Sequence, residues 1–212
     1  MTRELRPAPA NPRVPLPPHA AGQRIGLFGG TFNPPHEAHR AASLFALKRL
    51  KLDRIWWLVT PGNPLKDVSE LPPLEQRIAA AQKLAAHSRI DVTGFEAVIG
   101  TQYTCDTLAW LKTECPTERF VWIMGADNLK TFHRWKNWRT IAALVPIAIV
   151  DRGGYSLAGM SGPAAQVLAR ARIHESVAGT LADRPPPAWV FLHGLKMQLS
   201  STALRASEKG GV

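Results

Sequence analysis

The sequence predicts an α/β protein whose mostly parallel, twisted sheet carries helices on both faces. Apolar runs with strand character recur along the chain, at residues 24–28, 54–59, 89–92, 120–124, 146–150 and 188–192. Stretches with helical character lie between them, at residues 36–50, 74–87, 105–113, 138–144 and 164–172. Because strands and helices alternate, each strand should reach a parallel neighbour through a right-handed crossover. Ligands of such sheets bind beyond the carboxyl ends of the strands, near the point where the strand order reverses.

The composition is that of a soluble globular protein with anionic partners. The chain has 212 residues, of which 45% are hydrophobic and 20% charged, and this length can form one domain with a sizeable core. No apolar run approaches the ~18 residues that a membrane span needs. The formal net charge is +10, with Lys and Arg spread along the whole sequence. A nucleic-acid binder usually gathers its charge in a stripe or an arm, so nucleotides are favoured over a specific nucleic acid.

The first 23 residues contain six prolines and almost no periodic apolar pattern. They predict a disordered, basic tail at 1–23, ahead of a single domain at 24–212. The tail lacks the apolar core of a secretory signal, and Cys105 and Cys115 give no disulfide framework. We therefore expect a cytoplasmic protein. The oligomeric state is not predicted.

Residues 26–40 form the most informative segment of the chain. An apolar run ends in a glycine pair, Gly29 and Gly30, and Asn33 is then placed to cap a helix whose first turn holds the two following prolines. A strand that ends in glycines against a helix N-terminus lets a polyanion approach unpaired backbone N–H groups and a partial positive charge. The segment therefore indicates an anion site, although a Gly-Gly turn alone is common in proteins.

Two histidines, His36 and His39, lie three apart on one face of the opening turn of that helix. Imidazoles at this place suit the stabilisation of charge on a reacting phosphate. The spacing of three excludes the zincin motif, which needs histidines four apart. The segment also lacks both the G-x-G-x-x-G fingerprint and the G-K-[ST] of a P-loop. The alternative interpretation is two partly exposed helix residues with no role.

Polar groups follow several of the predicted strands, where they should converge on one crevice. Lys66 follows the second strand, Asp127 the fourth, and Arg152 the fifth. Hydroxyl residues at 200–202 follow the last strand and open a short helix, with Arg205 one turn on. Taken singly, these residues could equally be a solvated loop cation, a helix cap or surface arginines. Their common position at strand ends favours a shared ligand site.

The glycine–histidine segment resembles the signature of the nucleotidyltransferase superfamily, G-x-F-D/N-P-x-H-x-G-H, except that Ala38 stands where glycine is usual. The serine–threonine segment resembles the I-S-S-T-x-x-R phosphate motif of adenylyltransferases. Two further strings, Tyr103-Thr104-x-x-Thr107-Leu108 and Gly125-x-Asp127-x-x-x-x-Phe132-x-x-Trp135, are similar to patterns of bacterial nicotinate-nucleotide adenylyltransferases. Together the matched motifs span positions 25 to 205, nearly all of the chain after the tail.

The resemblance implies a Rossmann-like nucleotidyltransferase fold and the transfer of AMP from ATP to nicotinate mononucleotide, which gives deamido-NAD and pyrophosphate. Mg²⁺ is expected on the triphosphate, since no cage of several carboxylates is visible in the sequence, and no metal site of the protein is predicted. The residues implied to bind ATP are Gly29, Gly30, Thr31, Phe32, His36, His39, Gly125, Asp127, Ser200, Ser201, Thr202 and Arg205. Those implied to bind the mononucleotide are Tyr103, Thr104, Phe132, Trp135 and Arg152.

Catalytic roles are implied for His36, His39, Lys66 and Arg205. The histidines would donate to oxygens of the α-phosphate, and Arg205 and Lys66 would neutralise the remaining phosphates. Trp135 occupies the family position for stacking on the pyridine ring. It lies among several tryptophans of which most should be core residues, so a packing role is its alternative.

Three other functions stay open. The protein could prefer nicotinamide mononucleotide as the acceptor. It could belong to another branch that acts on phosphopantetheine or uses CTP, although that branch would not explain the Tyr-Thr and Phe-x-x-Trp strings. It could also be a nucleotide- or RNA-binding module without activity, against which both histidines, Lys66 and Arg205 argue.

Overall fold

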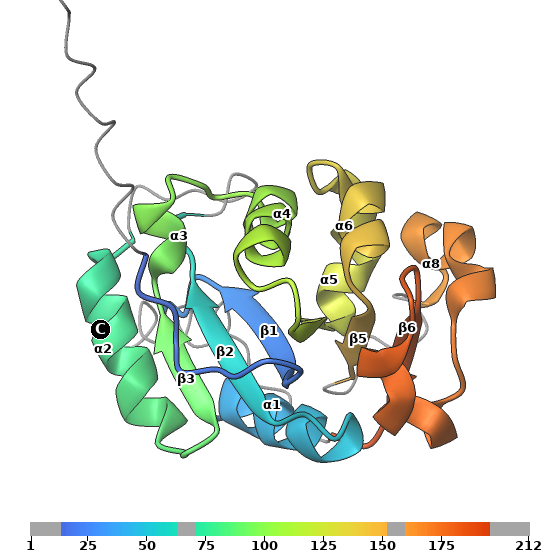
Figure 1. Cartoon of the computed structure of the whole chain (residues 1–212), viewed down its shortest axis with the longest axis horizontal. Coiled ribbons are helices and arrows are strands. Elements are labelled where there is room, and N and C mark those ends of the chain that lie inside the picture. Colours follow the sequence, from blue (N-terminus) through green and yellow to red (C-terminus); the bar gives the residue numbers. More distant parts are fainter. Residues whose placement is uncertain (1–13, 63–70, 152–159, 196–212) are drawn as a thin grey trace, which may run out of the picture.

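The computed structural model describes residues 14–62, 71–151 and 160–195 and shows a parallel six-stranded sheet between two layers of helices (Figure 1). The strand order is β3-β2-β1-β4-β5-β6, so the order reverses between β1 and β4. The strands are β1 (Arg24–Gly30), β2 (Arg54–Val59), β3 (Ile90–Thr93), β4 (Arg119–Gly125), β5 (Ile147–Val150) and β6 (Trp189–Leu192). Every strand lies within two residues of its predicted limits, which confirms the predicted fold class.

The helices confirm the predicted alternation and add short elements to it. The α-helices are α1 (Glu37–Arg49), α2 (Leu74–Ala85), α3 (Phe95–Val98), α4 (Thr104–Glu114), α5 (Ala126–Thr131), α6 (Trp138–Leu144) and α8 (Pro163–Val167). The 3₁₀ segments are η1 (Phe132–Arg134), η2 (Ala169–Ala171) and η3 (Glu175–Asp183). The single helix predicted at 164–172 is divided into α8 and η2. No helix within the described ranges has the length and apolar character needed to cross a bilayer.

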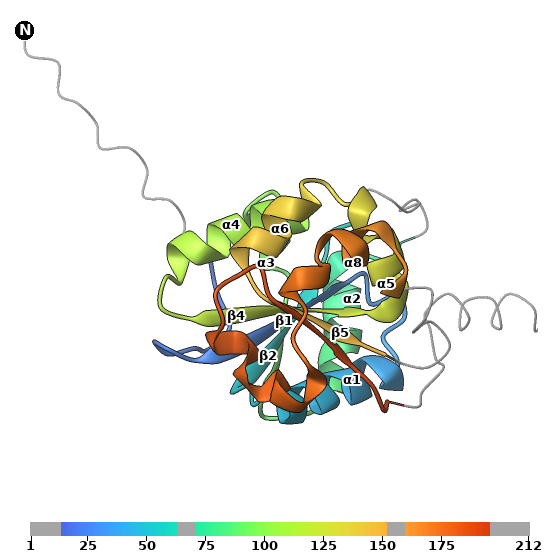
Figure 2. The ribbon, with the colours of Figure 1, turned by 90° about the vertical axis from the view of Figure 1, so that its right-hand side faces the viewer.

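The strands are apolar on both sides because helices cover both faces of the sheet (Figure 2). Consecutive residues of β2 show this directly. Trp56 joins a core cluster with α4, α5, α6 and α8, whereas Trp57 joins the opposite cluster with α1, α2 and η3. In the register of the sheet, Leu27 of β1 lies between Trp56 and Trp122 of β4, so large rings fill the centre of the first cluster.

Residues 14–23 differ from the prediction of a disordered tail. Val14 and Leu16 pack against the core cluster that contains Trp56, and the His19 ring lies 5.5 Å from the Trp56 ring. Apolar contact with the domain therefore outweighs the proline-rich composition of this segment. The packed part of the chain begins at least ten residues earlier than predicted, and residues 1–13 lie outside the described part.

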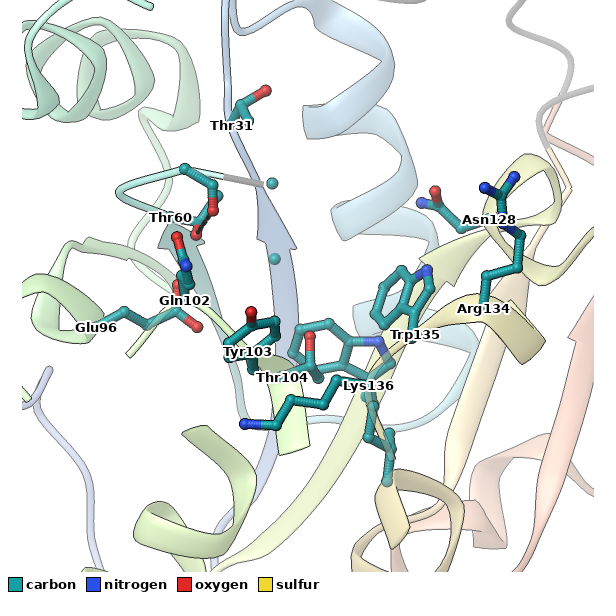
Figure 3. A pocket seen from close by; sticks show the side chains of 15 residues that line it. Thr31, Thr60, Glu96, Gln102, Tyr103, Thr104, Asn128, Arg134, Trp135 and Lys136 are labelled. Carbon is teal, nitrogen blue, oxygen red and sulfur yellow. Dashed lines mark hydrogen bonds between the residues drawn. The ribbon is translucent and has the colours of Figure 1, made fainter. Parts of the chain in front are cut away.

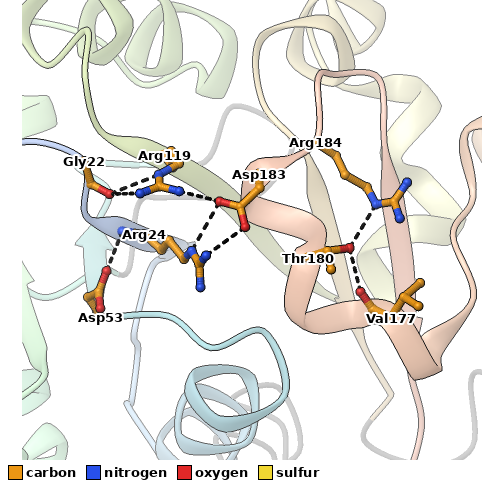
Figure 4. Close-up of polar contacts among 8 residues, drawn as sticks. All are labelled: Gly22, Arg24, Asp53, Arg119, Val177, Thr180, Asp183 and Arg184. Atoms are coloured by element: carbon orange, nitrogen blue, oxygen red, sulfur yellow. Dashed lines mark hydrogen bonds and ion pairs between the residues drawn. The ribbon is translucent and has the colours of Figure 1, made fainter.

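Ion pairs connect the elements at the amino ends of the strands (Figure 4). Asp183, at the end of η3, accepts hydrogen bonds from Arg24 of β1, at 2.8 Å, and from Arg119 of β4. Arg119 also donates to the carbonyl of Gly22 at 2.7 Å, and the backbone N–H of Arg24 donates to Asp53 at 2.7 Å. This network, which we call the amino-edge network, fixes η3 and the chain before β2 to the central strands.

Candidate functional site

A pocket of about 390 Å³ lies at the carboxyl ends of β1, β2 and β4, where the strand order reverses (Figure 3). This is the position that the order of strands predicts for a ligand. The pocket is lined by Gly29, Gly30, Thr31, Thr60, Gly62, Glu96, Gln102, Tyr103, Thr104, Trp122, Asn128, Arg134, Trp135, Lys136 and Ile141.

Six of the predicted site residues lie together in this lining, although they come from three distant parts of the chain. They are Gly29, Gly30, Thr31, Tyr103, Thr104 and Trp135. The glycine segment ends β1, the Tyr-Thr pair opens α4, and Trp135 follows η1. The fold therefore brings the three sequence motifs to one cavity.

Glycine is present at the two last positions of β1 for different structural reasons. A Cβ at Gly29 would lie 2.6 Å from the Trp122 indole, so glycine there makes room for a ring of β4. A Cβ at Gly30 would make only ordinary contact, at 3.4 Å, with the Phe32 ring. No clash inside the described protein requires glycine at position 30, and the missing side chain leaves its backbone open to the pocket.

Helix α1 begins at Glu37, and His36 rather than Asn33 is its N-cap, with an extended backbone at φ −147°. The sequence prediction of the cap is wrong because Pro34, which would be the first helical residue after an Asn33 cap, precedes Pro35, and a residue before proline is disfavoured in the helical region. The His36 and His39 rings lie one turn apart with centroids separated by 3.8 Å. The backbone N–H of His36 donates to His39 Nδ1 at 3.2 Å, so the second histidine caps the helix that carries it.

Aromatic rings surround the histidine pair. The His39 ring lies 4.9 Å from the Phe32 ring and 5.9 Å from the Phe28 ring, and Phe32 stacks on Trp57 at 4.9 Å. Phe32 is buried, so only its backbone is available to the predicted ATP site. His36 is 5% exposed. Neither histidine lines the pocket; the chain passes from the pocket wall at Thr31 to the start of α1.

Trp135 is half-buried on the pocket wall, whereas the neighbouring aromatic residues are core. Its ring lies 5.4 Å from Phe132 and 6.3 Å from Trp122, edge to face in both pairs. Phe132 is fully buried between Trp135 and Trp138, so the prediction that it touches substrate is wrong for its side chain. It supports Trp135 from behind.

The remaining predicted residues lie beside the pocket or outside the described ranges. Gly125 is the N-cap of α5, and Asp127 lies in the first turn of that helix, next to the pocket-lining Asn128. Neither Gly125 nor Asp127 lines the pocket itself. The predicted residues outside the described ranges are Lys66, Arg152, Ser200, Ser201, Thr202 and Arg205.

Glu96 is a buried acid that the sequence analysis did not single out. It lies in α3, is 5% exposed and lines the pocket, and the Thr107 hydroxyl donates to it at 2.7 Å. Burial raises the pKa of Glu96, against the hydrogen bonds from Thr107 and Thr60, which lower it. The sequence did contain a signal for this buried acid, because Glu96 is a charged residue inside the short apolar string Phe-Glu-Ala-Val-Ile.

Arg77 of α2 is the second residue that the sequence analysis missed. It is 4% exposed, and within the described residues all hydrogen bonds of its guanidinium go to backbone carbonyls. Burial lowers its pKa. The sequence did contain a signal for its burial. Arg77 precedes Ala81 by four residues and Ala85 by eight, so all three lie on the buried face of the helix.

A cation closes the side of the pocket opposite the glycines. Lys136 Nζ lies 4.2 Å from the centroid of the Tyr103 ring and donates to Asp106 at 3.1 Å. The hydrogen bond to Asp106 raises the pKa of Lys136. The contact joins the start of α4 to the segment after η1, on either side of the cavity.

Within the described ranges, no three His, Cys, Asp or Glu side chains are grouped so that they could hold a metal ion. The groups present are hydrogen-bond donors and aromatic rings rather than a carboxylate cage. Such a lining can hold a nucleotide by its phosphates, ribose and base.

Comparison with known proteins gives close relatives over most of the chain. The pattern of the cytidylyltransferase-like family matches residues 27–207. A "Probable nicotinate-nucleotide adenylyltransferase" of Bradyrhizobium sp. (strain ORS 278) is 63% identical over 182 residues, which cover 86% of this chain and 95% of that protein. A protein of the same name from Rhizobium meliloti (strain 1021) is 54% identical, over 88% of this chain and 99% of its own length.

A solved structure shares the fold at low sequence identity. The Plasmodium falciparum nicotinic acid mononucleotide adenylyltransferase complexed with NaAD superimposes with a TM-score of 0.64 at 18% identity. The match covers 87% of this chain and 83% of that one. The sheet and its helices are therefore those of a known enzyme fold.

Proposed function

Because the chain belongs to the cytidylyltransferase-like family and, within it, to the nicotinate-nucleotide adenylyltransferases, we propose that it transfers AMP from ATP to nicotinate mononucleotide. The products are deamido-NAD and pyrophosphate, and the reaction belongs to NAD biosynthesis. The reaction takes place in the cytoplasm, a location that the two buried free thiols, Cys105 and Cys115, support.

One observation carries the proposal. Three motifs separated by up to about a hundred residues of sequence line a single pocket, with the glycine turn at one side and Tyr103, Thr104 and Trp135 at the other. A polyanion suits the open backbone of the first side, and a flat heteroaromatic ring suits the half-buried indole of the second. Nicotinate mononucleotide and ATP together supply both.

The chemistry needs no covalent intermediate. The 5′-phosphate of the mononucleotide is already an anion at neutral pH, so it attacks the α-phosphorus of ATP in line and pyrophosphate leaves. ATP enters as its Mg²⁺ complex, and the metal neutralises part of the charge on the leaving group. The protein's own contribution is to align the two phosphates and to stabilise the charge on the α-phosphoryl group.

His36 and His39 supply donors for that charge. Since His39 Nδ1 accepts the backbone N–H of His36, the neutral His39 ring carries its proton on Nε2, which is then a donor. The helix that begins at Glu37 adds its own partial positive charge at the same place. Lys66 and Arg205, with the backbone after Ser201, hold the β- and γ-phosphates, and Asp127 binds the adenosine ribose.

The pyridine end of the pocket selects the acceptor. Trp135 stacks on the nicotinate ring, and Thr104 and the adjacent Tyr103 receive its carboxylate, with Arg152 as a further cation. Thr104 lies at the start of α4, where unpaired backbone N–H groups favour a carboxylate over an amide.

The test is a measurement of pyrophosphate release from MgATP with nicotinate mononucleotide, nicotinamide mononucleotide or phosphopantetheine as the acceptor. A parallel series replaces ATP with CTP. We expect fast release only with MgATP and nicotinate mononucleotide. Faster release of pyrophosphate with nicotinamide mononucleotide would indicate an adenylyltransferase that prefers the amide. No release with any pair of substrates would indicate a binding module without activity.

A further inference from the structure

Arg77 connects two walls of the pocket from behind. Its Nη1 donates to the carbonyl of Thr31 at 2.9 Å and to the carbonyl of Thr60 at 2.8 Å. Its Nη2 donates to the carbonyl of Pro61 at 3.3 Å, and its Nε donates to the carbonyl of Pro72 at 3.0 Å. A single guanidinium thus holds the chain just after β1, the chain just after β2 and the start of its own helix.

Two of the four residues that Arg77 holds are pocket residues. Thr31 and Thr60 both line the cavity, and the two loops are also joined directly, since the Thr60 N–H donates to the Gly30 carbonyl at 3.0 Å. The loop after β1 leads to the histidine pair of α1. Arg77 therefore reinforces, from behind the pocket, the backbone hydrogen bond that joins the glycine turn to the loop facing it.

Only an arginine can make this set of contacts. Its planar fork presents five N–H donors in fixed directions, whereas a lysine ammonium is a single point on a flexible stem. The guanidinium is buried, and its hydrogen bonds within the described residues go to neutral carbonyls, which orient it. The Glu75 carboxylate of the same helix acts on it electrostatically, but among the described residues the guanidinium forms no ion pair, so positive charge remains behind the glycine turn.

Arg54 provides the contrast, because it holds the other end of β2. It lies at the start of β2, and its guanidinium forms two hydrogen bonds of 2.7 Å to the carboxylate of Asp91 in β3. Its contacts stabilise the opposite end of the sheet and reach no pocket residue. The two arginines thus anchor the two ends of β2, and only one of them holds the site.

We propose that Arg77 is a positioning residue for the adenylyl transfer, which keeps the loops after β1 and β2 at the separation that the bound triphosphate requires. The inference rests on the proposed function. Arg77 touches neither substrate in this arrangement; it acts through Thr31 and Thr60. A displacement of about 1 Å at a reacting group can lower a rate by about 100-fold, so the loss of this contact should be visible in kcat.

The test compares Arg77→Lys and Arg77→Met with Arg54→Lys, in assays of kcat, of KM for both substrates and of thermal unfolding. We expect both Arg77 variants to lower kcat by about 100-fold. Arg54→Lys should lower the unfolding temperature by a similar amount to Arg77→Lys and leave kcat within about twofold. Arg77→Lys covers the case in which the methionine variant does not fold.

Chemical rescue gives a second readout. Arg77→Ala should regain part of its kcat when guanidinium chloride is added at millimolar concentration, and equal sodium chloride should not restore it. Guanidinium can occupy the same carbonyl pocket, whereas a general loss of stability would be worsened by it.

Three results would overturn the proposal. They are a kcat within about twofold of wild type in Arg77→Lys and Arg77→Met, equal kcat losses in Arg77→Lys and Arg54→Lys, or no rescue of Arg77→Ala by guanidinium. The failure of the proposed function would look different. It would appear as a wild-type protein that releases no pyrophosphate with nicotinate mononucleotide, before any variant is made.

Discussion

The two edges of the sheet treat charged side chains in different ways. At the amino edge, Asp183 accepts hydrogen bonds from Arg24 and Arg119, and the carboxylate of Asp91 accepts two from Arg54. At the carboxyl edge, Arg77 is held by backbone carbonyls and Glu96 by a threonine hydroxyl. The pair of Lys136 with Asp106 is an ion pair on that second edge.

This difference separates stability from binding. Opposite charges in the amino-edge network cancel one another, so they produce little electrostatic field outside the protein. Charges held by neutral dipoles keep their field, which can act on a charged ligand at the mouth of the strands. Changes at the amino edge should therefore alter unfolding alone. Changes at the carboxyl edge should alter turnover or substrate affinity as well, or the pH dependence of unfolding where the buried group is an acid.

The largest expected effect is at the histidine pair. His36→Ala and His39→Ala should each lower kcat by about 10²- to 10³-fold, the usual loss for one preorganised donor to a developing charge. His39→Ala should also destabilise the fold by about 1 kcal/mol, because it removes the cap of α1. Steady-state kinetics and urea unfolding measure the two effects.

His19→Ala is the matched control, since His19 lies against Trp56 and away from the pocket. It should leave kcat unchanged. If His36→Ala and His39→Ala both kept nearly full turnover, the role assigned to the pair would be wrong.

A smaller effect is expected at the pyridine end. Trp135→Ala should raise the KM for nicotinate mononucleotide by about tenfold, the scale of a lost aromatic contact, and change the KM for ATP much less. The control is Trp138→Leu, which removes a buried ring on the other side of Phe132 and should lower stability alone. Equal losses for both substrates in Trp135→Ala would make that residue a packing residue.

The next effect is a change in pH dependence at Glu96. Because the folded-state pKa is raised, the folded protein binds more protons than the unfolded chain once the pH exceeds the ordinary glutamate value of about 4.3. The free energy of unfolding contributed by this group therefore falls as the pH rises from that value through the folded pKa. Glu96→Gln keeps an acceptor for Thr107 and cannot ionise.

We expect the free energy of unfolding of Glu96→Gln to rise relative to that of the wild type as the pH is raised from 4 to 8, measured by urea unfolding at each pH. Asp91→Asn is a control for charge removal elsewhere, since its carboxylate is paired with Arg54. Parallel pH profiles for the wild type and Glu96→Gln would contradict the raised pKa.

The smallest effect is expected at the amino edge. Asp183→Asn should lower the free energy of unfolding by about 1 kcal/mol, because partly exposed ion pairs contribute little each. It should leave kcat and both KM values unchanged. A loss of turnover without a loss of stability would show that the two edges are not independent.

The sheet and the long helices could be predicted because their signals are periodic over many residues. The apolar runs of β1, β2 and β4 and the helices α1, α2 and α4 all lie close to their predicted limits. The short elements could not be found in this way. Segments such as α3, with four residues, and η1, with three, are fixed by contacts to the core and carry no period of their own.

The site residues that belong to a sequence motif could be predicted. Those whose role depends on contacts made only in the folded chain could not. The motif residues Gly29, Thr104 and Trp135 lie on the pocket wall, but the sequence could not distinguish the half-buried Trp135 from the fully buried Phe132 three residues before it. Arg77 belongs to no motif. Its function depends on carbonyls that only the folded chain brings to it.

Gly29 has a consequence for the wall that a substrate would meet. The indole of Trp122 occupies the space that any side chain at position 29 would need, 2.6 Å from where its first carbon would be. The indole can therefore lie directly against the backbone of β1, and both residues line the pocket. A larger residue at position 29 would have to displace that ring, so one substitution would disturb the core and the wall of the site together.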